Sequence, residues 1–141
     1  MIGNFATTNV VTTHPTTPIR EVARLMAQHR VGLVVLVDAK DPFKTVGVVS
    51  ERDVVRAVAY EIDLEAPAET IATKNVVTID HSEHVAKAAE AFRKHGIRHV
   101  VVTKDGKLYG VLSIRDLIRE EAVLRELAAY YEWTFEPGMT A

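Results

Sequence analysis

The chain has 141 residues, the size of one ordinary domain and enough to bury a core without disulfides or metals. It is 48% apolar and 26% charged with a formal net charge of -2, which favours a globular protein and gives no electrostatic reason to expect a nucleic acid partner. It contains no cysteine, which excludes disulfides, thiolate chemistry and cysteine-based zinc sites.

The N-terminal residues contain neither the basic region nor the long apolar region of a signal peptide. The longest apolar run, Val31 to Val37, is too short to span a bilayer. The sequence therefore predicts a cytoplasmic protein that makes no membrane contact.

An internal repeat organises the chain. ATTNVVT, from Ala6 to Thr12, returns as ATKNVVT, from Ala72 to Thr78. GVVSERD, from Gly47 to Asp53, returns in the same order as GVLSIRD, from Gly110 to Asp116. Self-similarity at a fixed spacing indicates two copies of one structural unit.

The first copy begins with a short β-branched run, Val10 to Thr12, that predicts an opening strand. Next comes a helix for which Thr17 is the expected N-cap and Pro18 the first helical residue. The run Val31 to Val37 is apolar at nearly every position, which predicts a strand covered on both faces. After a turn, a second strand leads into a helix that begins at Ser50. The apolar stripe of the first helix comprises Ile19, Val22, Ala23, Leu25 and Met26.

The second copy predicts the same elements. An opening strand covers Val76 to Ile79, and Ser82 is the expected N-cap of a helix that ends at Gly96. Two strands follow, separated by turn residues at 104–107, and a last helix begins at Ser113. The apolar stripe of the first helix of this copy comprises Val85, Ala88, Ala89 and Phe92.

These elements predict an α/β (α+β) fold in which a β-α-β-β-α unit occurs twice. We expect the first repeat at 1–62, a linker with alternating charge and Pro67 at 63–70, and the second repeat at 71–122. Residues 123–141 are expected to form a C-terminal helix and an aromatic tail.

The predicted C-terminal helix carries an apolar stripe for about four turns. Two interpretations stay open: the helix packs back on its own repeat, or its aromatic residues form an interface between subunits. The stripe comprises Leu117, Leu124, Leu127, Ala128 and Tyr131, and the aromatic group comprises Tyr130, Tyr131, Trp133 and Phe135.

The motif shared by GVVSERD and GVLSIRD has two interpretations. Ser and Asp three residues apart at a helix start form a capping-box-like pair, which explains them by helix stability alone. The same helix end also attracts an anion such as phosphate. Ser50 could add a hydroxyl, Arg52 a planar fork of donors for phosphate, and Asp53 an acceptor for the hydroxyls of a ribose.

In combination, the repeat length, the order of elements, the NVVT starts and the two G-h-h-S-x-x-D endings resemble tandem CBS domains, also called Bateman modules. The resemblance covers about Phe5 to Glu121. It implies that the repeats pack through their sheets about a pseudo-twofold axis and leave two clefts. It implies a sensor module that binds an adenine nucleotide in those clefts, most of all AMP, with ADP, ATP, S-adenosylmethionine or NAD as alternatives.

Carried over by position, the resemblance places Asp53 and Asp116 on ribose hydroxyls. It places the two serines on ribose or phosphate and the two arginines on phosphate; these residues are Ser50, Ser113, Arg52 and Arg115. The cleft of Asp53 would also contain Ala72, Val77, Ile97, Arg98 and His99. The cleft of Asp116 would also contain Ala6, Val11, Val31, Gly32 and Leu33.

The two expected clefts differ in charge. Arg98 and His99 form a basic pair, whereas the matching positions of the first repeat are Gly32 and Leu33. This difference predicts that the Asp53 cleft holds phosphate more tightly.

Metal binding and catalysis find little support in the sequence. His81 and His84 are three residues apart, a spacing compatible with two metal ligands, but no further ligands are placed by the sequence, so we expect a solvated helix start and no metal. The chain contains no Ser-His-Asp order, GxSxG, HExxH or P-loop, so we expect no enzymatic activity.

The expected partners are an adenine nucleotide, a second copy of the chain and a regulated protein on another chain. The resemblance and the aromatic C-terminus imply the homodimer. The alternative from a different class is a structural or protein-interaction module in which the paired motifs are helix caps only and no nucleotide binds.

Overall fold

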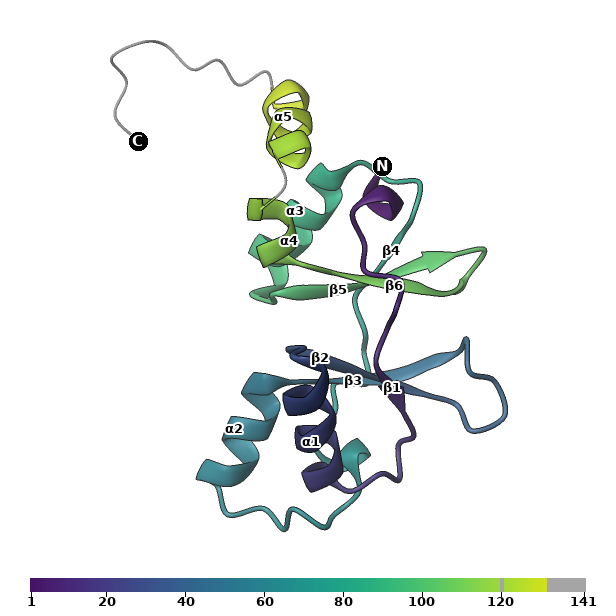
Figure 1. Ribbon diagram of the computed structural model, residues 1–141, viewed down its shortest axis with the longest axis vertical. Helices are drawn as coiled ribbons and strands as arrows, with labels where there is room; N and C mark the ends of the chain where they lie inside the picture. The colour runs from purple at the N-terminus through teal and green to yellow at the C-terminus, as the bar shows by residue number, and fades with distance from the viewer. Residues whose placement is uncertain (120, 132–141) are drawn as a thin grey trace.

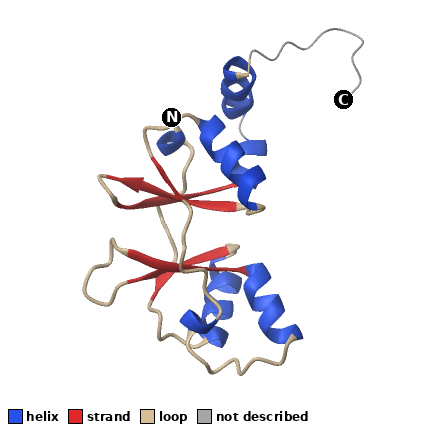
Figure 2. Cartoon of the chain, turned by 180° about the vertical axis from the view of Figure 1, so that it is seen from behind, coloured by secondary structure: helices blue, strands red, loops and turns tan. Residues whose placement is uncertain are grey.

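The computed structural model of the chain describes residues 1–119 and 121–131 (Figure 1). Two halves, each a three-stranded sheet covered by helices on its outer face, meet through their sheets in the middle of the molecule (Figure 2). The layers therefore run helix, sheet, sheet, helix, which confirms the predicted fold class. Trp133 and Phe135 of the predicted aromatic tail lie outside the described residues.

Both halves have the same topology. In each sheet, the first strand is parallel to the central strand and the third strand is antiparallel to it. The first half comprises β1 (Thr12–Thr13), α1 (Ile19–His29), β2 (Leu33–Val37), β3 (Thr45–Ser50) and α2 (Glu51–Ala59). The second half comprises β4 (Thr78–Asp80), α3 (Val85–His95), β5 (His99–Lys104), β6 (Lys107–Ser113) and α4 (Ile114–Arg119), followed by α5 (Glu121–Tyr130).

The two central strands join the halves. All five residues of β2 are buried, as predicted for a strand covered on both faces. Val34 and Leu36 pack toward the helices of the first half. The alternate side chains, Leu33, Val35 and Val37, pack with Val101 of β5 in a central cluster that both sheets share. Because this cluster is apolar and contributed by both repeats, it holds the sheets face to face.

Each repeat begins with a short segment that packs on the opposite half. The 3₁₀ helices η1 (Ile2–Asn4) and η2 (Ala68–Thr70) occupy matching positions of the two repeats. Ile2 is fully buried in the core of the second half, whereas Ala68 is buried in the core of the first. Thr7 exchanges two backbone hydrogen bonds of 2.9 Å with Val111 of β6, and Thr73 pairs in the same way with Val48 of β3. The halves are therefore joined by exchanged segments as well as by the central cluster.

The start of α1 is capped by backbone, not by a side chain. The N–H groups of Ile19 and Arg20 donate to the carbonyl oxygens of Ala66 and Leu64, at 3.0 and 2.9 Å. The expected N-cap at Thr17 is therefore wrong: Pro18 occupies that position without a side-chain bond. A side-chain cap is not needed because the connector between the repeats supplies the acceptors.

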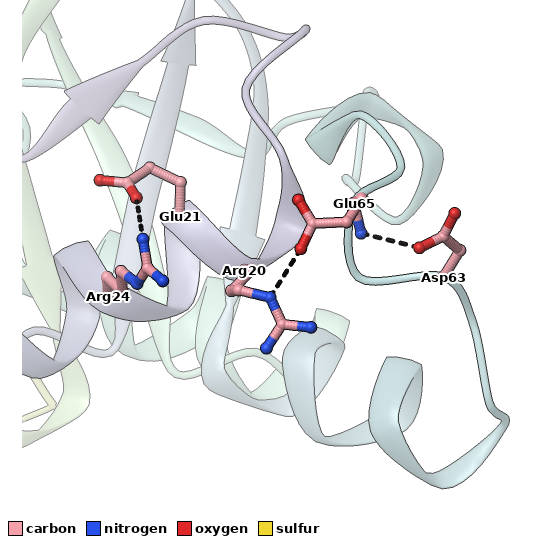
Figure 3. A network of polar contacts seen from close by, with 5 residues as sticks. All are labelled: Arg20, Glu21, Arg24, Asp63 and Glu65. Carbon is pink, nitrogen blue, oxygen red and sulfur yellow. Dashed lines mark hydrogen bonds and ion pairs between the residues drawn. The ribbon is translucent and has the colours of Figure 1, made fainter.

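Ion pairs on the surface position the same connector (Figure 3). Arg20 donates from Nε to Oε1 of Glu65 at 2.6 Å, and the Glu65 N–H donates to Oδ1 of Asp63 at 3.0 Å. Along α1, Arg24 pairs with Glu21 at 3.3 Å. These groups are exposed, so each pair stabilises the fold by only about 0.2–1 kcal/mol.

The start of α3 also differs from its prediction. His84, not Ser82, is the N-cap, and its Nδ1 atom accepts the N–H of Ala86 at 3.0 Å. Ser82 lies too far upstream and bonds to Asp80 instead. Gly96 ends the helix with a φ of 62°, as predicted for a left-handed C-cap.

The C-terminal helix packs back on its own half. Val123 of α5 is fully buried in the core of the second half, and Leu127 packs against it. The expected stripe was wrong at Leu124 and Tyr131, which are 49% and 50% exposed. The side of α5 that faces the core is the one that carries Val123 and Leu127, and Leu124 and Tyr131 lie outside it.

Replacing Ile2 by Ala should lower the free energy of unfolding by about 2–5 kcal/mol, because a fully buried side chain of the second core is truncated. Leu124, which is 49% exposed on α5, provides the control, and Leu124→Ala should lower it by much less. Urea denaturation of both variants measures this. Equal losses would contradict the exchange of the opening segments.

Gly110→Ala should destabilise the protein more than Gly47→Ala. A Cβ atom at residue 110 would stand 2.8 Å from the backbone oxygen of Thr7, whereas one at residue 47 would stand 3.3 Å from that of Thr73. We expect a cost of about 1–3 kcal/mol for Gly110→Ala, because backbone cannot move aside as a flexible side chain can. Thermal unfolding ranks the two variants, and the reverse order would contradict the packing of the first opening segment.

Candidate functional site

The first motif forms a complete capping box at the start of α2. The Asp53 N–H donates to Oγ of Ser50 at 3.3 Å, and the Ser50 N–H donates to Oδ2 of Asp53 at 2.8 Å. The Ser50 hydroxyl lies 3.0 Å from the same Oδ2 atom and donates to it. The helix-stability interpretation of the motif is therefore confirmed, and the hydroxyl proton of Ser50 already has an acceptor inside the chain.

The second motif repeats the box with one difference. The Asp116 N–H donates to Oγ of Ser113 at 3.1 Å, and the Ser113 N–H donates to Oδ2 of Asp116 at 2.9 Å. Among the described residues, the Ser113 hydroxyl proton has no acceptor, so it can donate to a ligand. In both boxes, Oδ1 of the aspartate has no hydrogen-bond partner within the described chain, which leaves an ionised acceptor for a hydroxyl group.

The helix starts offer fewer backbone donors than the sequence suggested. The Glu51 N–H donates to the Gly32 carbonyl at 3.0 Å, and the Ile114 N–H donates to the Arg98 carbonyl at 2.8 Å. The aspartate N–H groups are also bonded, so the N–H groups of Arg52 and Arg115 are the backbone donors that each helix start leaves for an anion, beside the side chains. Cationic side chains are present: Arg52, Arg98 and Arg115 are exposed, and none has an ion pair within the part of the chain that the structure describes.

The opening segments lie beside the strands that lead into the motifs. The Cβ atom of Ala6 lies 3.2 Å from the Cβ position of Gly110 on β6, and that of Ala72 lies 3.4 Å from the Cβ position of Gly47 on β3. The structure therefore brings Ala6 to the strand that ends at Ser113, and Ala72 to the strand that ends at Ser50, in the predicted grouping.

Other predicted apolar site residues are part of the cores. Val11 and Val77 accept backbone hydrogen bonds from the central strands of their own halves, at 3.0 and 3.3 Å. Val31 packs against the first core, Ile97 packs against the second, and Leu33 belongs to the central cluster. A role of these five residues in a cleft remains a prediction.

The start of each central strand is paired with the end of the third strand of its own repeat. Gly32 accepts the N–H of Glu51 and Leu33 is paired with Ser50, while the expected place of both residues in the Asp116 cleft stays a prediction. Likewise, the backbone of His99 is paired with Ser113, while the expected place of Arg98 and His99 in the Asp53 cleft stays a prediction. The antiparallel hairpin of each repeat causes this, because it returns the end of its third strand to the start of its own central strand.

Side chains of both halves meet where the start of α2 lies close to the start of β5, a place that we call the junction. The His99 ring lies 3.1 Å, and Oε1 of Glu51 lies 2.6 Å, from the point where a Cβ atom at residue 32 would stand. Glycine at this position therefore permits the close approach of His99 to the start of α2. Sequence reasoning missed Glu51; the difference between GVVSERD and GVLSIRD at this position was the available signal.

His99 is the most perturbed titratable group at the junction. Burial lowers the pKa of His99 below its ordinary value of 6.5, and the carboxylates of Glu51 and Asp116 oppose that shift. Arg115 and Arg98 act in the same direction as burial. The imidazole is therefore held neutral among charged groups from both halves.

A surface hollow of about 580 Å³ lies next to the junction. It is lined by apolar residues of α1 and α2, by Glu51 and Arg30, and by Arg115 of the opposite half. Asp53 and Asp116 are not among its lining residues. Within the described residues, no three acidic, histidine or cysteine side chains form a group that could hold a metal ion, and no helix is long and apolar enough to cross a membrane.

The lowered pKa of His99 predicts a pH dependence. The unfolded chain binds the proton more readily, so stability is fully present above about pH 6.5 and falls as the pH drops toward the lower pKa of the folded state. In His99→Gln this part of the decline should disappear, whereas the exposed His14→Gln should keep it. Urea denaturation between about pH 7.5 and pH 5.5 measures the slopes. Identical slopes for the wild type and His99→Gln would contradict the burial of a neutral imidazole.

Relatives of known sequence match most of the chain. An uncharacterised 17.7 kDa protein of Acidianus ambivalens is 36% identical over 119 residues, which cover 84% of this chain and 71% of that protein. The inosine-5'-monophosphate dehydrogenase of Aquifex aeolicus is 31% identical over 115 residues, which cover 80% of this chain but only 23% of the enzyme. The likeness to the dehydrogenase therefore leaves most of that enzyme unmatched.

Two solved structures have the same fold. A CBS domain protein from Pyrobaculum aerophilum, complexed with AMP, is 48% identical, has a TM-score of 0.86 and matches over 91% of this chain and 98% of its own. The CBS domain pair of the protein MJ0100, in complex with 5-methylthioadenosine and S-adenosyl-L-methionine, is 26% identical, with a TM-score of 0.77 and coverage of 84% and 93%. The CBS domain family model matches residues 2–60 and 68–123. The chain therefore belongs to the CBS domain family and contains a tandem pair of these domains.

Proposed function

We propose that the protein is a regulatory module that binds an adenine nucleotide, AMP first of all, and signals the bound state to a partner protein. One observation carries the proposal: a structure with 48% identity over nearly the whole chain contains AMP. The free oxygen of each motif aspartate supports it, since an ionised acceptor at that place suits the hydroxyls of a ribose.

Each nucleotide would contact elements of both repeats. The aspartate of one helix start accepts the ribose hydroxyls, and the alanine of the opposite opening segment lies beside the adenine. Arg52 or Arg115, which have no internal partner within the described chain, would hold the phosphate. Of the two serines, Ser113 can donate to the ligand, whereas the Ser50 proton is directed at Asp53.

The preference of phosphate for the Asp53 cleft, which the charge difference between the clefts predicts, stays part of the proposal. The backbone of Arg98 and His99 joins the β6–α4 junction near Asp116, while the His99 ring lies beside Glu51 on α2. The His99 ring therefore reaches the helix start that carries Asp53, which supports the preference.

A signal would pass through the contact between the repeats. A ligand shifts a conformational equilibrium only by its different affinity for two states, and here it would bridge an opening segment and a helix start from different repeats.

We further propose a homodimer. Exposed apolar side chains on α2 and α4 suit such an association: Val55, Val58, Tyr60, Ile114 and Ile118.

Two other functions each have an observation in their favour. The complex of MJ0100 favours S-adenosylmethionine or a related adenosine derivative as an alternative ligand. The complete capping boxes favour a structural or protein-interaction module, because helix stability explains Ser50 and Asp53 without a ligand. We propose a binding module and no enzymatic activity.

Calorimetry with AMP, ADP, ATP, NAD and S-adenosylmethionine tests the proposed function. AMP at 100 times its Kd should raise the free energy of unfolding by about 2.7 kcal/mol. Asp53→Asn and Asp116→Asn keep an oxygen for the serine N–H but remove the charged acceptor, so the affinity of the altered cleft should fall by about 10- to 100-fold.

Asp105→Asn is the matched control. Asp105 lies in the β5–β6 turn with a φ of 53°, a conformation that asparagine tolerates, so this variant should bind as the wild type does. No response to any adenosine ligand would favour the structural module instead. Unchanged affinity in both cleft variants would contradict the assigned role of the aspartates.

A further inference from the structure

Glu51 is an acidic residue that lines the same hollow as the cationic side chains of Arg30 and Arg115. It is the first residue of α2, directly between Ser50 of the capping box and Arg52. Its Oε1 atom lies above Gly32, 2.6 Å from the Cβ position, and the His99 ring approaches the same point from the other half. The carboxylate therefore lies at the contact of the two repeats, on the helix start that also carries Asp53 two residues further on.

The second repeat has no equivalent charge. Ile114 follows Ser113 in the second motif, where Glu51 follows Ser50 in the first. Opposite Glu51, the first repeat has Gly32, whose missing side chain leaves room for the carboxylate. Opposite Ile114, the matching residue is Arg98, whose carbonyl accepts the Ile114 N–H. Capping does not explain this difference, because Ser and Asp form the box in both copies.

Other charged groups surround the carboxylate. Arg30 at the end of α1 and Arg115 of the opposite half line the same hollow as Glu51. Asp116 and Arg98 also act on the His99 ring. The cations can balance a limited negative charge, but the carboxylate repels any anion that extends over Gly32.

We propose that Glu51 determines ligand specificity by favouring adenosine ligands with one phosphate over those with three. The proposal rests on the proposed function, because it assumes that an adenine nucleotide binds at this junction. ATP carries about two more negative charges than AMP near neutral pH, so a nearby carboxylate weakens ATP binding more than AMP binding. The backbone bond from Glu51 to Gly32 holds the main chain of residue 51 beside Gly32, so the carboxylate stays within side-chain reach of this place.

Glu51→Gln tests the proposal because it keeps the size of the side chain and removes its charge. The readout is the ratio of the Kd of ATP to the Kd of AMP, measured by calorimetry in magnesium-free buffer of low ionic strength. The wild type should prefer AMP, and Glu51→Gln should reduce the ratio by about tenfold, because the repulsion between one carboxylate and the two added charges of ATP is removed. Added salt should reduce the ratio in the wild type as well.

Glu83→Gln is the matched control, because it removes the same charge from an exposed position before α3 and should leave the ratio unchanged. A ligand-free readout comes from NMR titration of His99, whose pKa should fall in Glu51→Gln when the opposing carboxylate is removed. An unchanged nucleotide ratio, a wild type that prefers ATP, or an unchanged His99 titration overturns the proposal. If the wild type binds neither nucleotide, the proposed function itself fails.

Discussion

The apolar contact between the two sheets is the interaction on which the rest of the structure depends. Leu33, Val35 and Val37 on one side and Val101 on the other remove both inner sheet faces from water. Burial of such side chains contributes about 1.5–3 kcal/mol each. Because this contact fixes the sheets face to face, it also brings the start of α2 and the start of β5 together at Gly32 and His99. The proposed binding junction is thus a consequence of core packing.

The motif residues combine stability with binding capacity. One carboxylate oxygen of each aspartate closes a capping box, and the other remains without a partner within the described chain. The capping interpretation and the binding interpretation are therefore compatible, because they use different atoms. The two copies differ in detail: Ser50 directs its proton at Asp53, Ser113 does not direct one at Asp116, and only the first copy carries Glu51.

The sequence predicted the repeat, the order of elements and the double burial of the central strand, because these follow from periodicity and local residue preferences. It mispredicted the N-caps at Thr17 and Ser82. The acceptors for the first N–H groups of α1 come from the connector, which is distant in the sequence, and the N-cap of α3 is His84, a residue type that is not a usual N-cap. The exchange of the opening segments, the pairing of Arg98 with Ile114 and the position of Glu51 depend on tertiary packing, which spacing along one chain does not reveal.

A crystal structure of the protein with AMP tests the central claim most directly. The account predicts AMP between the repeats, with a ribose hydroxyl within about 3 Å of Oδ1 of Asp53 or Asp116 and the phosphate beside an arginine of the junction. The capping boxes should remain intact, since the ligand uses the other oxygen. AMP bound on the outer helices, or bound between the repeats with both aspartates untouched, would contradict the account.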